Sequence, residues 1–297
     1  MRDIKQIFQI AKQNFTGWRK NPRIWMTFAL AFVLCLMLSD QVISQAVRYE
    51  TPLQIVEPFV WTYGDASSVM LSSLLLVLLF ADMPFVSQAT PYWLIRSKRR
   101  IWLMGQVVYV VLATIIYNLF LLTVLGIVAA PFSFVGNVWS KTAAMLGYGG
   151  GESITVPVSV KTMEISTPYM CAISVFALML LYSLLVAVFM LFLNLSIGNM
   201  AGVLGAFALN LYGLFLNPSI FRKLFHFTGN LAYKANVLCG WLSPLNHATF
   251  PMHNFGYDYL PKLWMSMGIL FVFILVLILL SGMKMRSYSF SFIQAEE

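Results

Sequence analysis

Long apolar runs without polar interruption are the feature that most restricts how this chain can fold. Leu74–Phe80 and Leu270–Leu280 are apolar on every side, whereas the strands of a membrane barrel alternate apolar and polar side chains. An α-helix needs about 20 apolar residues to cross roughly 30 Å of hydrocarbon, and several stretches of the chain have this character over comparable lengths. The pattern predicts an all-α integral membrane protein.

The composition agrees with this fold and narrows the choice of partners. Of the 297 residues, 60% are hydrophobic and only 10% are charged, against about 25% charged residues in soluble domains. A lipid bilayer is therefore the expected surrounding. The formal net charge of +8 is typical of basic cytoplasmic loops. Because no aromatic and basic platform or recognition motif accompanies it, nucleic acid is not an expected partner.

The chain is predicted to form one transmembrane domain, residues 1–297, that begins with an amphipathic interfacial helix. In residues 1–22 apolar side chains such as Ile4, Ile7 and Phe8 recur at helical spacing with lysines between them, a pattern typical of a helix lying in the headgroup region. A cleaved signal peptide is the alternative, and it is disfavoured because the segment before the apolar core is too long. Six transmembrane helices follow, at about residues 24–47, 66–88, 101–129, 169–195, 201–216 and 263–282.

Two longer connections, residues 131–168 and 217–261, are expected to form extracytoplasmic loops. The β-prone residues 153–160 suggest strand character in the first loop, and apolar stretches suggest that part of the second dips back into the membrane. Most of the 19 Lys and Arg residues lie in the N-terminal segment, between residues 96 and 100, and after residue 282. Because basic residues favour the cytoplasmic side, we expect a multi-pass protein of the cell membrane with both termini in the cytoplasm.

No motif for catalysis or nucleotide binding is present. The chain lacks the GxxxxGK[ST] loop, the HExxH zinc motif and the GxSxG nucleophile motif, so we expect no enzyme activity and no cofactor or metal bound by this chain. His247, His253 and Asp258 could together bind a metal on the outer side, although separate polar loop residues are the simpler interpretation. Cys171 and Cys239 are both expected near the outer side, which leaves a disulfide between them open.

Asp82 is an acidic residue predicted to lie close to the membrane, where a carboxylate is costly unless it is paired or near water. It could pair with Arg96, Lys98 or Arg99 of the adjacent basic loop, or cap a short helix before Pro84. We therefore predict a structural role for this near-membrane acid rather than a proton relay.

Three glycines, Gly198, Gly202 and Gly205, have a spacing that permits close helix packing at the start of the fifth span. They could pack spans four and five within the chain, which we favour, or form the seam of a dimer. Asparagines inside the spans are expected to form hydrogen bonds between helices; these are Asn118, Asn194 and Asn210.

A resemblance to a known family rests on two features together. One is the basic amphipathic leader that runs directly into the first span. The other is Asp82-Met83-Pro84-Phe85 followed by residues 91–106, where Ser97, Arg100 and Gly105-Gln106 are similar to a run that leads into span three. Together they resemble the membrane subunit of a type-2 ABC (ATP-binding cassette) exporter. In that family the loop between spans two and three docks on a separate ATPase, and the matching residues here are Pro91, Tyr92, Trp93, Leu94, Ile95, Arg96, Ser97, Lys98, Arg99 and Arg100.

The resemblance implies a permease subunit that works with partners. These would be a cytoplasmic ABC ATPase, which binds ATP and Mg, and a second permease that is identical or paralogous. The cargo would be amphipathic or hydrophobic, such as a peptide, lipid or drug, because nearly charge-free spans offer few contacts to ions or sugars. The long outer loops depart from a minimal member of the family, and a short helical hairpin between spans five and six would account for part of the second. A secondary transporter or channel, and a non-transporting scaffold or sensor, stay open as alternatives.

Overall fold

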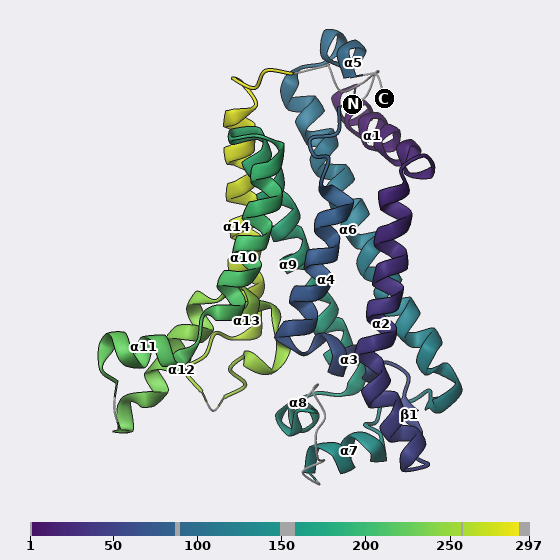
Figure 1. The fold of residues 1–297 in the computed structure, drawn as a ribbon, viewed down its shortest axis with the longest axis vertical. Coiled ribbons are helices and arrows are strands. Elements are labelled where there is room, and N and C mark those ends of the chain that lie inside the picture. The colour runs from purple at the N-terminus through teal and green to yellow at the C-terminus, as the bar shows by residue number, and fades with distance from the viewer. Residues whose placement is uncertain (1, 87–89, 149–157, 228, 257, 291–297) are drawn as a thin grey trace.

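The computed structural model describes residues 2–86, 90–148, 158–227, 229–256 and 258–290. They form an elongated bundle of helices with smaller elements at both ends (Figure 1). The helices along the bundle are α2 (Pro22–Arg48), α4 (Ala66–Phe80), α6 (Arg99–Ala129), α9 (Pro168–Ser196), α10 (Asn199–Phe215) and α14 (Leu263–Lys284). The central helix is α9, which contacts α4, α6, α10 and α14.

Shorter elements lie toward the two ends of this bundle. One end carries α1 (Arg2–Thr16) and α5 (Thr90–Arg96), and we call it the α1 end (Figure 1). The 3-10 turn η1 (Gly17–Arg19) joins α1 to α2. Toward the opposite end lie β1 (Leu53–Gln54), α3 (Glu57–Tyr63), η2 (Ala130–Phe132), β2 (Ser133–Phe134), α7 (Lys141–Tyr148), α8 (Val160–Ile165), α11 (Pro218–Phe225), η3 (Gly229–Leu231), α12 (Ala232–Leu242), α13 (Pro244–Ala248) and η4 (Phe250–Met252).

In their described parts, the two long connections thus contain several short helices. The first also contributes β2, which pairs in parallel with β1 so that Leu53 lies opposite Ser133. Of the stretch predicted to have strand character, residues 153–157 lie outside the described part of the chain, and Val160 begins helix α8.

Four helices among the described residues are long and apolar enough to cross a membrane, namely α2, α6, α9 and α14. Two further pairs meet the same requirement only when taken together, and each is bent at a short break: α3 with α4 by 86°, and α10 with α11 by 70°. The fold is therefore helical, and its composition and helix lengths indicate a multi-pass membrane protein with four spans, or up to six if each bent pair is one span.

The predicted extent of the second span is wrong at its end. We expected a helix over residues 66–88, but α4 ends at Phe80 and residues 81–86 are not helical. Residues 87–89 lie outside the described part. The reason is Pro84, which has no N–H for the helical ladder and whose ring disfavours helical backbone at the preceding residue. At its other end α4 begins where expected, because the Asp65 carboxylate accepts hydrogen bonds from the backbone N–H of Ser67 and Ser68 at 2.9 and 3.2 Å.

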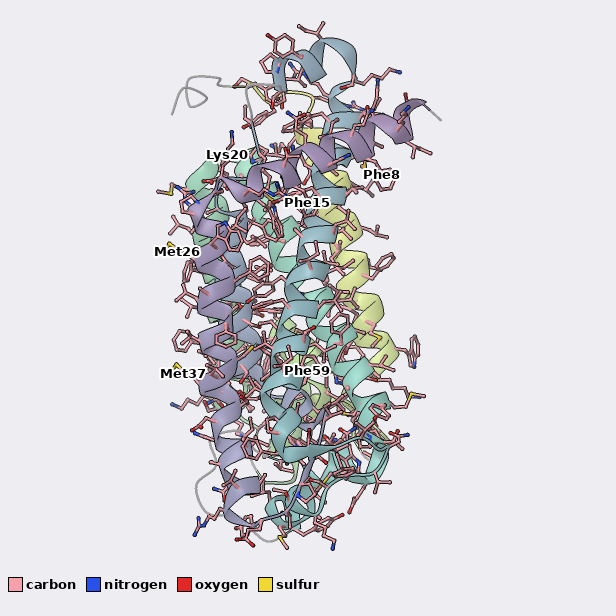
Figure 2. The ribbon with its side chains drawn as sticks, turned by 90° about the vertical axis from the view of Figure 1, so that its right-hand side faces the viewer. Phe8, Phe15, Lys20, Met26, Met37 and Phe59 are labelled. Carbon is pink, nitrogen blue, oxygen red and sulfur yellow. The ribbon has the colours of Figure 1, made fainter. Side chains whose placement is uncertain are left out.

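Apolar side chains cover the outside of the bundle as well as its interior. Met26 and Met37 of α2 point outward and are 58% and 70% exposed, whereas Phe59 of α3 is buried (Figure 2). Leu279 of α14 is likewise 70% exposed. Extended apolar surface of this kind is unfavourable in water and is suited to contact with lipid.

Two of the three glycines noted above pack α10 against α9. A Cβ on Gly202 would overlap the Asn194 side chain, and a Cβ on Gly205 would overlap Leu193 of α9. Gly198 instead has open space around it and a φ of +143°, a conformation that favours glycine, in the turn that precedes α10. The close packing of Gly202 and Gly205 is therefore a contact within this chain.

Asn194 joins three segments at the same contact. Its Oδ1 accepts a hydrogen bond from the backbone N–H of Gly202 at 2.7 Å, and its Nδ2 donates to the carbonyl of Met83 at 2.7 Å. The side chain thereby satisfies an N–H of the first turn of α10, which has no partner within its own helix. It also anchors the non-helical segment that follows α4.

The other two asparagines differ in what they connect. The Oδ1 of Asn210 accepts hydrogen bonds from Ser73 of α4 at 2.6 Å and from Tyr182 of α9 at 3.0 Å, so it joins three helices. Asn118 donates only to Thr114 of its own helix, at 2.9 Å, and its buried Oδ1 has no partner among the described residues. The expected bonding between helices thus occurs at Asn194 and Asn210, while Asn118 bonds within α6.

Replacing Asn194 with alanine is expected to destabilise the fold by about 2 kcal/mol, because the N–H of Gly202 and the carbonyl of Met83 would both lose a buried partner. Unfolding by SDS in mixed micelles measures this loss. Asn118→Ala is the matched control, since it removes a buried asparagine that makes one bond within its own helix. Equal losses in the two variants would contradict a role for Asn194 in tying segments together.

Candidate functional site

The helix α5 stands beyond the bundle at the α1 end (Figure 1). Its residues Tyr92 and Ile95 are 68% and 83% exposed, and Lys98 and Arg100 just after it are exposed as well. No described carboxylate pairs with either of these two basic residues. The side chains of Trp93 and Arg96 lie outside the described part of the chain. The segment expected to dock on a partner is thus a short projecting helix that presents apolar and cationic groups together.

Arg99 has a different role from its basic neighbours. Its Nη1 donates to the carbonyls of Arg286 and Tyr288, both at 3.0 Å, and its guanidinium lies 5.8 Å from the ring centre of Phe290. The buried ring of Trp102 packs edge-on against the same Phe290, at 5.2 Å between ring centres. The segment after α14 therefore binds the beginning of α6. Sequence reasoning missed this contact; the three aromatic residues in the short polar tail, Tyr288, Phe290 and Phe292, were the available signal.

Helix α1 packs across the beginning of α6 at this end (Figure 2). Ile10 and Ala11 of α1 are buried, and a Cβ on Gly105 of α6 would lie only 2.6 Å from Cγ2 of Ile10. Trp18 completes the contact by donating from its indole Nε1 to the Tyr109 hydroxyl at 2.8 Å. Gly105 is thus the residue that lets the two helices approach closely.

Gln106 connects α1 to the segment that follows α4. Its Oε1 accepts a hydrogen bond from Asn14 of α1 at 3.0 Å, and its Nε2 donates to the carbonyl of Phe85 at 3.3 Å. The adjacent pair Gly105 and Gln106, which carried part of the family resemblance, therefore has a defined place in the structure. It holds the leader helix, the 81–86 segment and α6 together.

Asp82 pairs with Arg23 in the first turn of α2. The partner differs from two of those expected from sequence: Arg99 is occupied by the segment after α14, and Lys98 forms no ion pair with a described carboxylate. The third, Arg96, has its side chain outside the described part of the chain. Both side chains of the pair are about half exposed, at 55% and 48%, and such pairs contribute only about 0–1 kcal/mol. Asp82 thus adds a weak link between α2 and the 81–86 segment.

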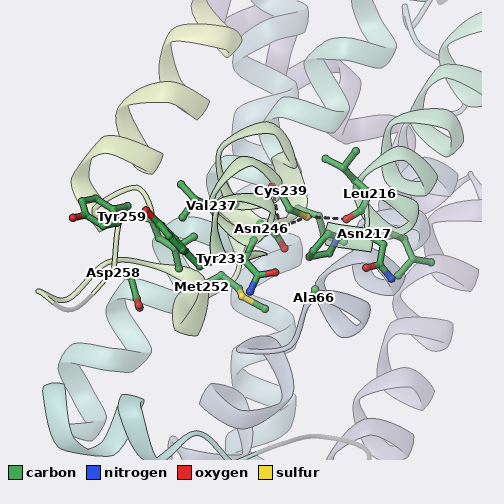
Figure 3. A pocket seen from close by; sticks show the side chains of 17 residues that line it. Ala66, Leu216, Asn217, Tyr233, Val237, Cys239, Asn246, Met252, Asp258 and Tyr259 are labelled. Carbon is green, nitrogen blue, oxygen red and sulfur yellow. Dashed lines mark hydrogen bonds between the residues drawn. The ribbon is translucent and has the colours of Figure 1, made fainter. Parts of the chain in front are cut away.

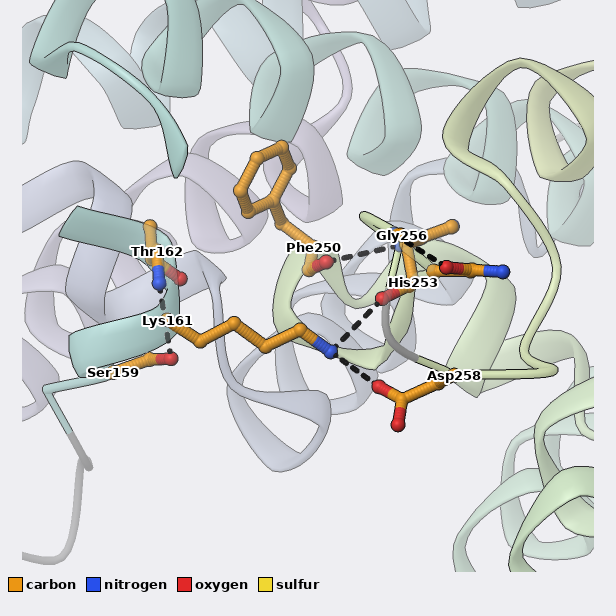
Figure 4. A network of polar contacts seen from close by, with 8 residues as sticks. Ser159, Lys161, Thr162, Phe250, His253, Gly256 and Asp258 are labelled. Atoms are coloured by element: carbon orange, nitrogen blue, oxygen red, sulfur yellow. Dashed lines mark hydrogen bonds and ion pairs between the residues drawn. The ribbon is translucent and has the colours of Figure 1, made fainter. Parts of the chain in front are cut away.

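The residues considered for a metal site on the far side are engaged separately. His247 of α13 donates from Nε2 to the carbonyl of Trp241 at 3.0 Å, and its Nδ1 lies 2.8 Å from the hydroxyl of Ser266. Asp258 pairs with Lys161 at 2.9 Å (Figure 4). Among the described residues no group of three or more His, Cys, Asp or Glu side chains is placed to hold a metal ion.

Burial also governs the titration of the two histidines at this end. His253 is fully buried, and the Lys161 ammonium donates to its backbone carbonyl at 3.1 Å (Figure 4). Burial lowers the pKa of both His247 and His253, because the charged imidazolium is poorly solvated there. The three cysteines, Cys35, Cys171 and Cys239, are buried with free thiols, so the disulfide left open above is not formed.

The described geometry thus gathers the residues that carried the family resemblance at the α1 end of the bundle. Tyr92, Ile95, Lys98 and Arg100 are presented outward, while Arg99, Gly105 and Gln106 hold the surrounding segments together. Comparison with models of known protein families and with curated proteins finds no match for this chain.

Proposed function

We propose that this chain is the membrane subunit of a type-2 ABC exporter, driven by a separate ATPase that binds ATP and Mg. The observation that carries the proposal is α5, which projects from the bundle with Ile95 and Tyr92 exposed. It is followed by Lys98 and Arg100, which pair with no carboxylate among the described residues. Exposed apolar anchors flanked by charges are the usual composition of a protein docking surface. The proposal further takes each bent helix pair as one span, which gives six crossings.

Orientation in the cell membrane follows from the charges at the α1 end. Exposed basic residues gather there, including Lys5, Lys12, Lys98, Arg100 and Lys284. Under the positive-inside rule this end faces the cytoplasm. Both termini then lie in the cytoplasm, on the side where an ATPase could bind α5.

The contacts at this end supply a route for force. A partner that moves α5 would move the start of α6, to which Gly105 and Gln106 couple α1 and the 81–86 segment. The pair of Asp82 with Arg23 extends the connection to α2, and Arg99 extends it to the segment after α14. Docking at one short helix would thereby reach several spans at once. A second copy or a paralogue would complete the path for an amphipathic or hydrophobic cargo.

Replacing Ile95 with aspartate is expected to weaken binding of the ATPase enough to prevent its recovery with the chain. Ile95 is 83% exposed, so the fold should tolerate the change, whereas loss of a central apolar anchor weakens an interface by at least about 2 kcal/mol, or roughly 30-fold. The measurement is recovery of ATPase activity with the tagged chain from native membranes. Ile95→Leu is the control and should retain the partner. A wild-type chain that never recovers an ATPase, or an Ile95→Asp chain that still does, would contradict the proposal.

A further inference from the structure

A cavity of about 890 Å³ (Figure 3) is lined in part by α12 and α13, which lie toward the end opposite α1 (Figure 1). Its walls come from the end of α10, the α11–α12 hairpin, α13, and residues 258–260 before α14, and Ala66 at the start of α4 contributes one edge. The volume is within the range of about 300–1,000 Å³ seen for small-molecule sites. No function considered so far uses this space.

The polar part of the lining consists of neutral groups that both donate and accept hydrogen bonds. Asn236 is exposed in the cavity, and its side chain has no hydrogen bond within the described residues. Within the described residues, Asn217 uses its Oδ1 alone, which accepts from the N–H of Ser219, and Asn246 uses its Nδ2 alone, which donates to Cys239. The Nδ2 of Asn217 can therefore donate to a ligand, and the Oδ1 of Asn246 can accept from one.

Tyrosines add hydroxyls to these amides without adding charge. The rings of Tyr233 and Tyr259 lie 6.3 Å apart along one wall (Figure 3). Asp258 is the one charged side chain in the described lining, and Lys161 neutralises it at 2.9 Å. The basic residues of the hairpin, such as Lys234, do not line the cavity. A phosphate or ammonium headgroup would therefore find no opposite charge free to compensate it, whereas hydroxyls or amides would find partners.

The remaining wall is apolar and continues onto the outside of the bundle. Leu214 lines the cavity and is also 41% exposed. Leu211, one helical turn away on α10, is 42% exposed, and Phe215 is 67% exposed. Residues three to four apart share one side of a helix. An apolar chain could thus lie along α10 while its polar head occupies the cavity.

We propose that this cavity binds an amphiphile with an uncharged, hydrogen-bonding headgroup. The amides and phenols hold the head, and the exposed apolar side of α10 receives the chain. That the bound amphiphile is cargo rests on the proposed function. Binding itself can be tested on this chain alone in vesicles, without an ATPase.

The test uses Asn236→Cys and a membrane-impermeant maleimide. The chain is reconstituted in phosphatidylcholine vesicles with dioctanoylglycerol or with dioctanoyl phosphatidate, which differ only by the charged phosphate. Dioctanoylglycerol should slow labelling about tenfold at saturation, and phosphatidate should leave it unchanged. Lys234→Cys, which is exposed on the same helix outside the cavity, should be unaffected by both. Native Cys239 adds little background, because burial raises the pKa of its thiol.

A second variant tests binding without replacing Asn236, because the cysteine introduced there could itself alter binding. Val237→Trp places a large ring in the cavity and should lower retention of radiolabelled dioctanoylglycerol about tenfold, while Lys234→Trp should not. Equal protection by both lipids, or retention unchanged in Val237→Trp, would overturn the site. A chain that binds dioctanoylglycerol but never recruits an ATPase would refute the proposed function and leave this site standing.

Discussion

Replacing Gly105 with leucine is expected to detach helix α1 from the bundle. A Cβ at this position would lie 2.6 Å from Cγ2 and 2.7 Å from Cβ of Ile10, and 3.3 Å from the backbone oxygen of Ile7. Because two of these atoms lie on or next to the α1 backbone, the clash cannot be relieved by turning one flexible side chain. Overpacking of this kind costs about 1–3 kcal/mol or more, and displacement of α1 is the route that relieves it.

Hydrogen exchange measures the detachment directly. Backbone amides of α1 should exchange at least about tenfold faster in Gly105→Leu, because a short helix without its packing partner is marginal in water. Gly126→Leu is the matched control in the same helix, since a Cβ there meets nothing within 4 Å. It should be neutral or slightly stabilising, as leucine favours helix over glycine by about 0.8 kcal/mol.

Under the proposed function the same variant should lose cargo transport while α5 still recruits the ATPase, because docking is intact and the link to α1 is broken. Normal protection of α1 amides in Gly105→Leu would show that the contact with Ile10 does not hold this helix. If Gly105→Leu detaches α1 but transports cargo at the wild-type rate, α1 does not transmit movement from the ATPase to the spans.

Replacing Glu57 with glutamine is expected to cost about 2–4 kcal/mol of stability. Glu57 is fully buried at the start of α3. One carboxylate oxygen accepts from the backbone N–H of Ser140 at 2.6 Å, and the other accepts from the Ser140 hydroxyl at 2.6 Å and the N–H of Gln54 at 3.2 Å. Each oxygen faces a backbone donor, so either orientation of a glutamine amide would set its NH2 group against an N–H.

The position of Ser140 explains why the loss should be large. Its hydroxyl also accepts a hydrogen bond from the N–H of Ala143 in the first turn of α7, at 3.0 Å. Glu57 therefore holds α3 and α7 together through one serine. Loss of this contact should let α7 separate from α3 at that end of the bundle.

SDS-induced unfolding and limited proteolysis between residues 133 and 148 measure this effect. Ser140→Ala should cost less than Glu57→Gln, about 1–2 kcal/mol, because the backbone N–H of residue 140 still donates. Glu164→Gln is the control, an exposed glutamate that accepts one bond from Tyr148 at 3.0 Å, and it should change stability by less than about 0.5 kcal/mol. A Glu57→Gln chain as stable as the control would mean that the carboxylate is replaceable.

Much of the architecture could be predicted from the sequence alone, because a membrane-spanning helix is recognised by the length and apolar composition of one continuous segment. The runs around residues 24–47, 101–129, 169–195 and 263–282 are long, apolar and free of proline within their cores. They correspond closely to α2, α6, α9 and α14. A span must satisfy its own backbone hydrogen bonds, so its length and apolarity suffice to identify it.

The tertiary structure alone decided which polar residues meet and what each one does. No local pattern reveals that Asp82 pairs with Arg23, that Arg99 holds the segment after α14, or that Glu57 caps α7 through Ser140. These partners are separated by dozens of residues or more, and the contacts depend on how helices bend and cross. The 86° bend between α3 and α4 and the 70° bend between α10 and α11 have the same origin. Packing, which is non-local, sets these angles, whereas solvation by lipid sets the spans themselves.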